Sequence, residues 1–128
     1  MTLILDSGGV SALAGQRARL AELRRRGEWP PQVPAVVLTE VLTGEHRRDF
    51  HVNHVLRLSQ IRTVDEPTAR LAALLRTRTG RAATISATDA VVVALATRYP
   101  QPVVLTSDAD DLRALAEHTE RPIAVAEA

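Results

Sequence analysis

Short apolar runs and spaced leucines follow one another along the chain and predict alternating strands and helices. Runs that include β-branched residues and end at glycine, proline or an acid are typical of buried strands. Leucines three or four positions apart among arginines are typical of amphipathic helices. The predicted strands are residues 2–5, 33–38, 61–64, 102–105 and 123–125. The predicted helices are residues 10–13, 17–26, 48–58, 66–80, 86–96 and 108–118, with another after residue 38 that carries Glu40.

Strands alternate with helices over the whole chain, without repeats, low-complexity stretches or a linker. Right-handed crossovers between parallel strands would put helices on both faces of the sheet. We therefore predict an α/β fold with a mostly parallel sheet of about four to five strands. In such folds ligands collect at the carboxyl ends of the strands.

Composition excludes several kinds of chemistry. The 128 residues include no cysteine, which excludes disulfides, thiol catalysis and cysteine-ligated metals and fits a reducing cytoplasm. All 16 basic residues are arginines, so no mechanism can depend on a lysine. The formal net charge of +1 is too small to steer the whole protein onto nucleic acid. No apolar run approaches the roughly 20 residues of a membrane helix, so we expect no membrane association.

Four acids follow predicted strands or open a predicted helix. Asp6 ends the first strand, Glu40 follows the second by two residues, and Asp108 follows the strand that ends at residue 105. Asp89 falls in the first turn of the helix that Ser86 caps. The four carboxylates are therefore expected to meet at one edge of the sheet.

Clustered carboxylates raise one another's pKa and need a cation or shared protons. Mg²⁺ or Mn²⁺ prefers oxygen ligands and suits phosphodiester hydrolysis. Helix capping alone would also explain Asp89 or Asp108. Asp6 has no such explanation, because Ser-Gly-Gly follows it and no helix is predicted to begin there. In the first turn of the last helix, Asp110 or Asp111 could act as an additional ligand.

Four short motifs together resemble the PIN-domain family, and within it the VapC-type toxins of bacterial toxin–antitoxin pairs. The motifs are Leu-Ile-Leu-Asp at 3–6, Leu-Thr-Glu-Val-Leu-Thr-Gly at 38–44, Ala-Thr-Asp-Ala at 87–90 and Leu-Thr-Ser-Asp-Ala-Asp-Asp-Leu at 105–112. Their order and spacing cover essentially the whole chain. A single PIN-like domain over residues 1–128 is the expectation.

The resemblance implies a three-layer α/β/α sandwich that cleaves RNA with Mg²⁺ or Mn²⁺. It also implies a homodimer and a cognate antitoxin whose C-terminal segment covers the site. Thr106 and Ser107 would lie beside the metal as polar groups. Ser7-Gly8-Gly9 departs from the family's usual stretch after the first acid, which puts any contact made there in doubt. The implied catalytic and metal-binding acids are Asp6, Glu40, Asp89 and Asp108, with Asp111 as an additional metal ligand.

Other charged and aromatic residues carry weaker signals. The arginine groups could contact RNA phosphates or an acidic antitoxin tail, or could simply be solvated helix faces. His46, His51 and His54 lack a third ligand at zinc-site spacing, so they are predicted to lie on the surface or face a partner. Three aromatic residues are too few for a base-stacking platform. The arginine groups are 24–26, 47–48, and Arg76, Arg78 and Arg81.

Two other functions lack a residue or motif that they need. A phosphoryl-accepting receiver domain would need a lysine, and a dehalogenase-like phosphatase would need Asp-x-Asp where this chain has Asp6-Ser7-Gly8. Two alternatives stay open: a non-catalytic PIN-fold module that binds a partner or RNA, and a stand-alone RNA-processing nuclease without an antitoxin.

Overall fold

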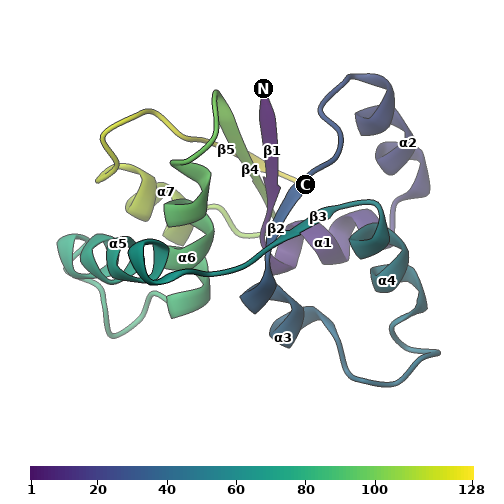
Figure 1. The fold of residues 1–128 in the computed structure, drawn as a ribbon, viewed down its shortest axis with the longest axis horizontal. Coiled ribbons are helices and arrows are strands. Elements are labelled where there is room, and N and C mark those ends of the chain that lie inside the picture. The colour runs from purple at the N-terminus through teal and green to yellow at the C-terminus, as the bar shows by residue number, and fades with distance from the viewer.

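The centre of the molecule is a five-stranded sheet in which every strand runs parallel to its neighbours. A computed structural model describes residues 1–128 (Figure 1). The strand order is β3-β2-β1-β4-β5, and β1 and β4 pair in the middle, with Leu3 opposite Val103 and Leu5 opposite Leu105. The strands are β1 Thr2–Leu5, β2 Gln32–Pro34, β3 Gln60–Arg62, β4 Pro102–Thr106 and β5 Ala124–Glu127.

Helices cover both faces of this sheet, as the sequence predicted. The helix α1 packs on one face of β4 together with α4, and α6 packs on the other face together with α5 and α7 (Figure 1). The three-layer α/β/α sandwich is therefore confirmed. No helix is both long and apolar enough to cross a membrane. The helices are α1 Ser7–Ala14, α2 Arg17–Arg25, α3 Leu38–Val41, α4 Phe50–Arg57, α5 Glu66–Arg78, α6 Ala87–Ala96 and α7 Asp110–Ala116, with a 3₁₀ turn at Ala35–Val37.

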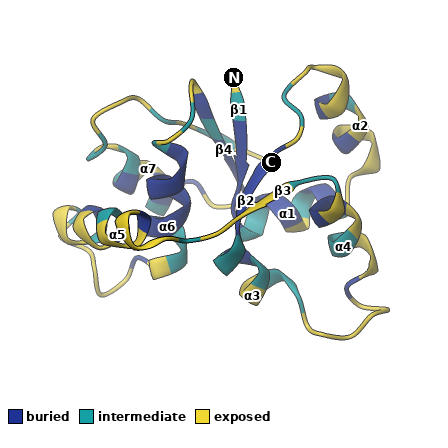
Figure 2. Ribbon diagram, viewed as in Figure 1, coloured by how far each residue is buried: buried dark blue, intermediate teal, exposed yellow.

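The core lies on both faces of the middle strands, against α6 on one face and against α1 and α4 on the other. Ile4 and Leu5 of β1 are completely buried, and the helix α6 is buried at every position from 90 to 96 (Figure 2). This helix is apolar on all sides because strands lie against one side of it and α5 and α7 against the others. Ser86 caps it as predicted, accepting a hydrogen bond from the Asp89 amide at 3.0 Å.

The strand order places a topological switch point between β1 and β4. The chain goes from β1 to β2 on one side, whereas β4 and β5 lie on the other side. In open parallel sheets, ligands bind in the crevice that forms beside the carboxyl ends of the strands at such a point. Asp6 directly follows β1 there, and Thr106 ends β4 there.

The predicted second strand, residues 33–38, is wrong beyond Pro34. β2 ends at Pro34, and the next residues form the 3₁₀ turn that leads into α3. The run looked like a strand because Val37 is fully buried, and a short buried helical turn has the same apolar pattern as a buried strand. Glu40 therefore lies in α3, six positions beyond the last residue of β2, and not two.

Candidate active site

Asp6 is buried at the junction of β1 and α1, with only 5% of its surface exposed. Its Oδ1 accepts a hydrogen bond from the Gly9 amide at 2.7 Å, and its Oδ2 accepts one from the Thr106 hydroxyl at 2.6 Å. The expectation that Asp6 serves no helix was wrong, because this carboxylate is the N-cap of α1. The same two hydrogen bonds fix the orientation of both carboxylate oxygens.

Gly8 and Gly9 allow the first turn of α1 to touch the end of β4. A Cβ on Gly9 would lie 2.2 Å from the Leu105 carbonyl oxygen, and one on Gly8 would lie 2.2 Å from Ser107 Oγ. Only glycine tolerates so close an approach of one backbone to another. The Ser-Gly-Gly stretch therefore brings Asp6 within reach of Thr106.

Ser7 makes the contact that the unusual sequence after Asp6 had put in doubt. Its hydroxyl donates a short hydrogen bond to Glu40 Oε1, which joins the start of α1 to α3. Glu40 lies 34 positions beyond Asp6 in the chain, yet it is hydrogen-bonded to Ser7, the residue that directly follows Asp6.

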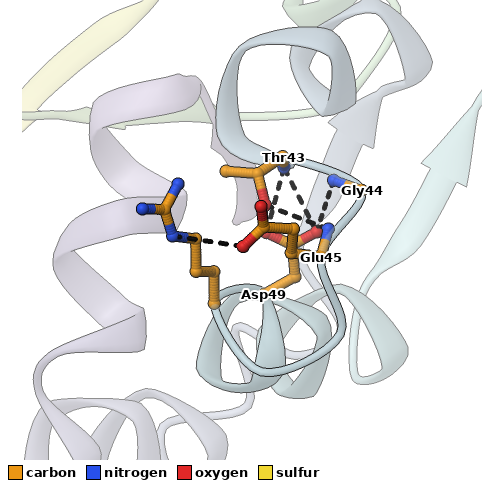
Figure 3. A network of polar contacts seen from close by, with 5 residues as sticks. Thr43, Gly44, Glu45 and Asp49 are labelled. Carbon is orange, nitrogen blue, oxygen red and sulfur yellow. Dashed lines mark hydrogen bonds and ion pairs between the residues drawn. The ribbon is translucent and has the colours of Figure 1, made fainter.

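A polar network stabilises the loop that leaves α3 (Figure 3). The Asp49 carboxylate accepts hydrogen bonds from the Thr43 amide at 3.0 and 3.1 Å, from the Thr43 hydroxyl at 2.8 Å and from the Gly44 amide at 2.9 Å. The Thr43 amide is the main reason why the pKa of Asp49 is lowered. Asp49 is 4% exposed, so this loop is anchored and fixes the chain directly after the helix that carries Glu40.

Asp89 shares an electrostatic environment with acids from three other segments. Its pKa is raised to about 6, first by burial and then by the charges of Asp6, Asp111 and Glu40, while the hydrogen bond with Ser86 acts in the opposite direction. Burial also raises the pKa of Asp6, and the Glu40 charge adds to that rise. The structure therefore brings Asp6, Glu40 and Asp89 together with Asp111 at the carboxyl edge of the sheet.

The acids that follow β4 have different surroundings. Asp108 is exposed, and its amide donates to the Thr106 hydroxyl at 3.1 Å, so Thr106 ties this turn to Asp6. Asp111 lies in the first turn of α7 and forms an ion pair with Arg81, Nη2 to Oδ1, at 2.5 Å. Sequence reasoning missed this partner, because no local pattern links residues 30 positions apart.

The donor set fits a hard divalent cation, since every candidate ligand is a carboxylate. Two of these acids, Asp6 and Asp89, have raised pKa values, mainly because they are withdrawn from solvent and secondly because other carboxylates lie near them. No three Asp, Glu or His side chains are close enough to one another to form a ready-made metal site. The acids gather at one edge but stand further apart than the ligands of one ion.

The candidate histidines and the first arginine group lie on the surface. His46, His51 and His54 are exposed, as predicted. Arg25 and Arg26 pair with Glu22 on α2, so they belong to a solvated helix face.

The PIN domain family model matches residues 10–118 of this chain. This chain belongs to the PIN domain family. The match covers Glu40, Asp89, Asp108 and Asp111 and begins four positions after Asp6. Comparison of the sequence with curated proteins finds no match.

Solved structures share the fold of this PIN domain over nearly its whole length. DNA-bound VapBC from Salmonella typhimurium has a TM-score of 0.72 at 13% identity, and the match covers 99% of this chain and 98% of that one. VapBC2 from Rickettsia felis, bound to a promoter DNA fragment, has a TM-score of 0.72 at 11% identity, and the match covers 100% of this chain and 99% of that one. FitAcB from Neisseria gonorrhoeae has a TM-score of 0.66 at 20% identity, and the match covers 96% of this chain and 95% of that one. At such low identities, these TM-scores show a common fold and no more.

The raised pKa of Asp89 predicts how the stability of the metal-free PIN domain depends on pH. A group whose pKa rises from 3.8 to about 6 on folding binds protons more tightly in the folded state. Its contribution to stability is thus present at low pH and is lost as pH rises from 3.8 to about 6. Thermal unfolding in EDTA across this range should show a falling Tm, and Asp89→Asn should make the fall shallower and raise Tm at neutral pH.

Asp110→Asn is the matched control, since Asp110 is exposed and makes no ion pair. It should keep the wild-type pH dependence. If Asp89→Asn left the fall in Tm unchanged, Asp89 would not be the half-buried acid with a raised pKa described above.

Proposed function

We propose that this protein is a Mg²⁺- or Mn²⁺-dependent endoribonuclease and the toxin component of a VapC-type toxin–antitoxin pair. The supporting observation is the shared electrostatic environment of Asp6, Glu40, Asp89 and Asp111 at the switch point of a PIN fold. The proposed catalytic acids are Asp6, Glu40, Asp89 and Asp108, with Asp111 as an additional metal ligand.

These carboxylates would hold the divalent ion and neutralise one another's repulsion through it. A bound Mg²⁺ or Mn²⁺ supplies Lewis-acid stabilisation of the scissile phosphate and activates water as the nucleophile. The protein's own part is to pre-orient the ligands. The Gly9 amide and the Thr106 hydroxyl hold the two oxygens of Asp6, and Ser7 holds Glu40.

A protein partner is part of the proposal. The solved structures with this fold include VapBC and FitAcB, in each of which one chain matches this protein over nearly its whole length. We infer a cognate antitoxin that covers the acidic edge with a C-terminal segment, and a homodimer as the active form.

Expression in bacteria tests the toxin proposal. Induced wild-type protein should arrest growth with fragmentation of cellular RNA, and co-expression of the small reading frame expected upstream should restore growth. Cells that express Asp6→Asn should grow normally, with intact RNA. Normal growth with a protein that cleaves RNA in vitro would instead identify a stand-alone RNA-processing nuclease.

One observation favours a second candidate, a non-catalytic module that binds RNA or a protein. No three of the acids are close enough to one another to hold an ion as the structure stands. Such a module would bind its partner equally well in EDTA and would leave RNA intact with either metal.

A further inference from the structure

Arg81 lies beside the acidic edge and pairs with one of its members. It belongs to the loop of residues 79–86, which joins α5 to the helix that carries Asp89. Its Nη2 is 2.5 Å from Asp111 Oδ1, and none of the other candidate acids takes part in an ion pair. Arg81 is thus the cation in direct contact with this group of acids.

The backbone around Arg81 is held in place by the protein itself. The Arg81 carbonyl accepts hydrogen bonds from the Thr84 and Ile85 amides, both at 2.9 Å. The Arg76 guanidinium donates to the Ile85 carbonyl at 3.0 Å and to the Ala82 carbonyl at 2.8 Å. Ile85 is buried, which fastens the loop to the core. Arg76 is therefore used internally, and Arg81 is presented from a fixed backbone.

The Arg81 guanidinium has donors that are free to bind another ligand. It is 47% exposed, and its Nε and Nη1 donate to no protein group, because only Nη2 is used by Asp111. The planar guanidinium presents its donors in a fork that matches two oxygens of a phosphate. An RNA strand approaching a group of carboxylates needs such a positive group, since the acids themselves repel its phosphates.

We propose that Arg81 binds a phosphate of the RNA strand beside the acidic edge, and that Asp111 holds its guanidinium in position until the strand arrives. This inference rests on the proposed ribonuclease function and names the residue that contacts the substrate backbone. The contact reads the phosphate and not the base, so it strengthens binding to any sequence.

The test measures binding of a short fluorescein-labelled single-stranded RNA by anisotropy, in EDTA and at several salt concentrations. Arg81→Gln should weaken binding about tenfold and reduce the slope of log K against log salt by about 0.7, the value for one phosphate contact on a single strand. Arg81→Lys, which keeps the charge, should retain the slope. Arg57→Gln is the matched control: Arg57 is exposed on α4 just before β3 begins, at the opposite edge of the sheet.

Asp111→Asn separates phosphate binding from a merely structural ion pair. It removes the same ion pair but leaves the Arg81 guanidinium free, so it should bind RNA at least as tightly as Asp110→Asn, which removes one exposed charge nearby. If the pair only fastens α7 to the loop, Arg81→Gln and Asp111→Asn should weaken binding alike.

The outcomes distinguish this inference from the function on which it rests. If wild type cleaves RNA in Mg²⁺ and Arg81→Gln binds RNA as tightly as Arg57→Gln does, the role of Arg81 is overturned and the nuclease function stands. Equal losses in Arg81→Gln and Asp111→Asn would overturn that role too. A wild type that neither binds nor cleaves RNA would overturn the proposed function and this inference together.

Discussion

Gly9→Ala is expected to destabilise the protein by about 3 kcal/mol or more, at the upper end of the cost of overpacking. The new Cβ would lie 2.2 Å from the Leu105 carbonyl oxygen, which is backbone and cannot rotate away. The φ of Gly9 is not in the left-handed region, so the cost is steric and not conformational. Urea unfolding of the purified variant measures the loss.

Gly15→Ala is the control for this prediction. A Cβ there would meet its nearest atom, the Ala12 carbonyl oxygen, at 3.7 Å, an ordinary contact. Its effect should stay within about 1 kcal/mol, because alanine also reduces the entropy of the unfolded chain. Equal stability of the two variants would show that α1 does not approach β4 as closely as described.

Asp6→Asn is expected to lower RNA cleavage by more than about a hundredfold, beyond the cost of losing an outer partner of a metal ligand. Asparagine is as good an N-cap as aspartate, so the hydrogen bond from Gly9 can be kept while the charge is lost. The far-UV circular dichroism should therefore match wild type and Tm should not fall, with cleavage rates measured under single-turnover conditions.

Asp110→Asn carries the same chemical change at an exposed position of α7 and should cleave like wild type. Cleavage by Asp6→Asn at the wild-type rate would remove Asp6 from the proposed site. A comparable loss of RNA cleavage in both variants would show that cleavage depends on the overall negative charge and not on Asp6 as a specific ligand.

Much of the fold was predictable from the sequence because its signals are local. The run that ends at Asp6, the Ser86 cap and the leucine spacing of α5 each describe one element and need no knowledge of the others. The parallel sheet followed from the alternation of such elements, since strand–helix–strand units have one favoured handedness.

The errors arose where a local signal had two meanings. No predicted helix included the Gly8-Gly9 pair, but it lies inside α1, where it permits close packing on β4. The capping role of Asp6 was not predicted, because the predicted helix began at residue 10, three residues after the true start of α1. The apolar residues after Pro34 were assigned to a strand, although they form a buried 3₁₀ turn.

The acidic edge was predictable only in part. Asp6 and Asp89 could be placed by the ends of the elements that carry them, but the ion pair of Arg81 with Asp111 depends on tertiary packing of the 79–86 loop against α7. Contacts of that kind leave no periodic trace in a sequence. The sequence therefore offered Arg81 only as one member of an arginine group, and its contact with the acidic edge emerges from the structure.

Cleavage of a total-RNA pool by the purified wild-type protein tests the central claim most directly. Fragments that form with Mg²⁺ or Mn²⁺ and disappear when EDTA is added are the expected result, because the carboxylates need the ion to act on a phosphodiester. Intact RNA under both metals, from protein with a native Tm, would contradict the nuclease account and leave the PIN-fold binding module as the function.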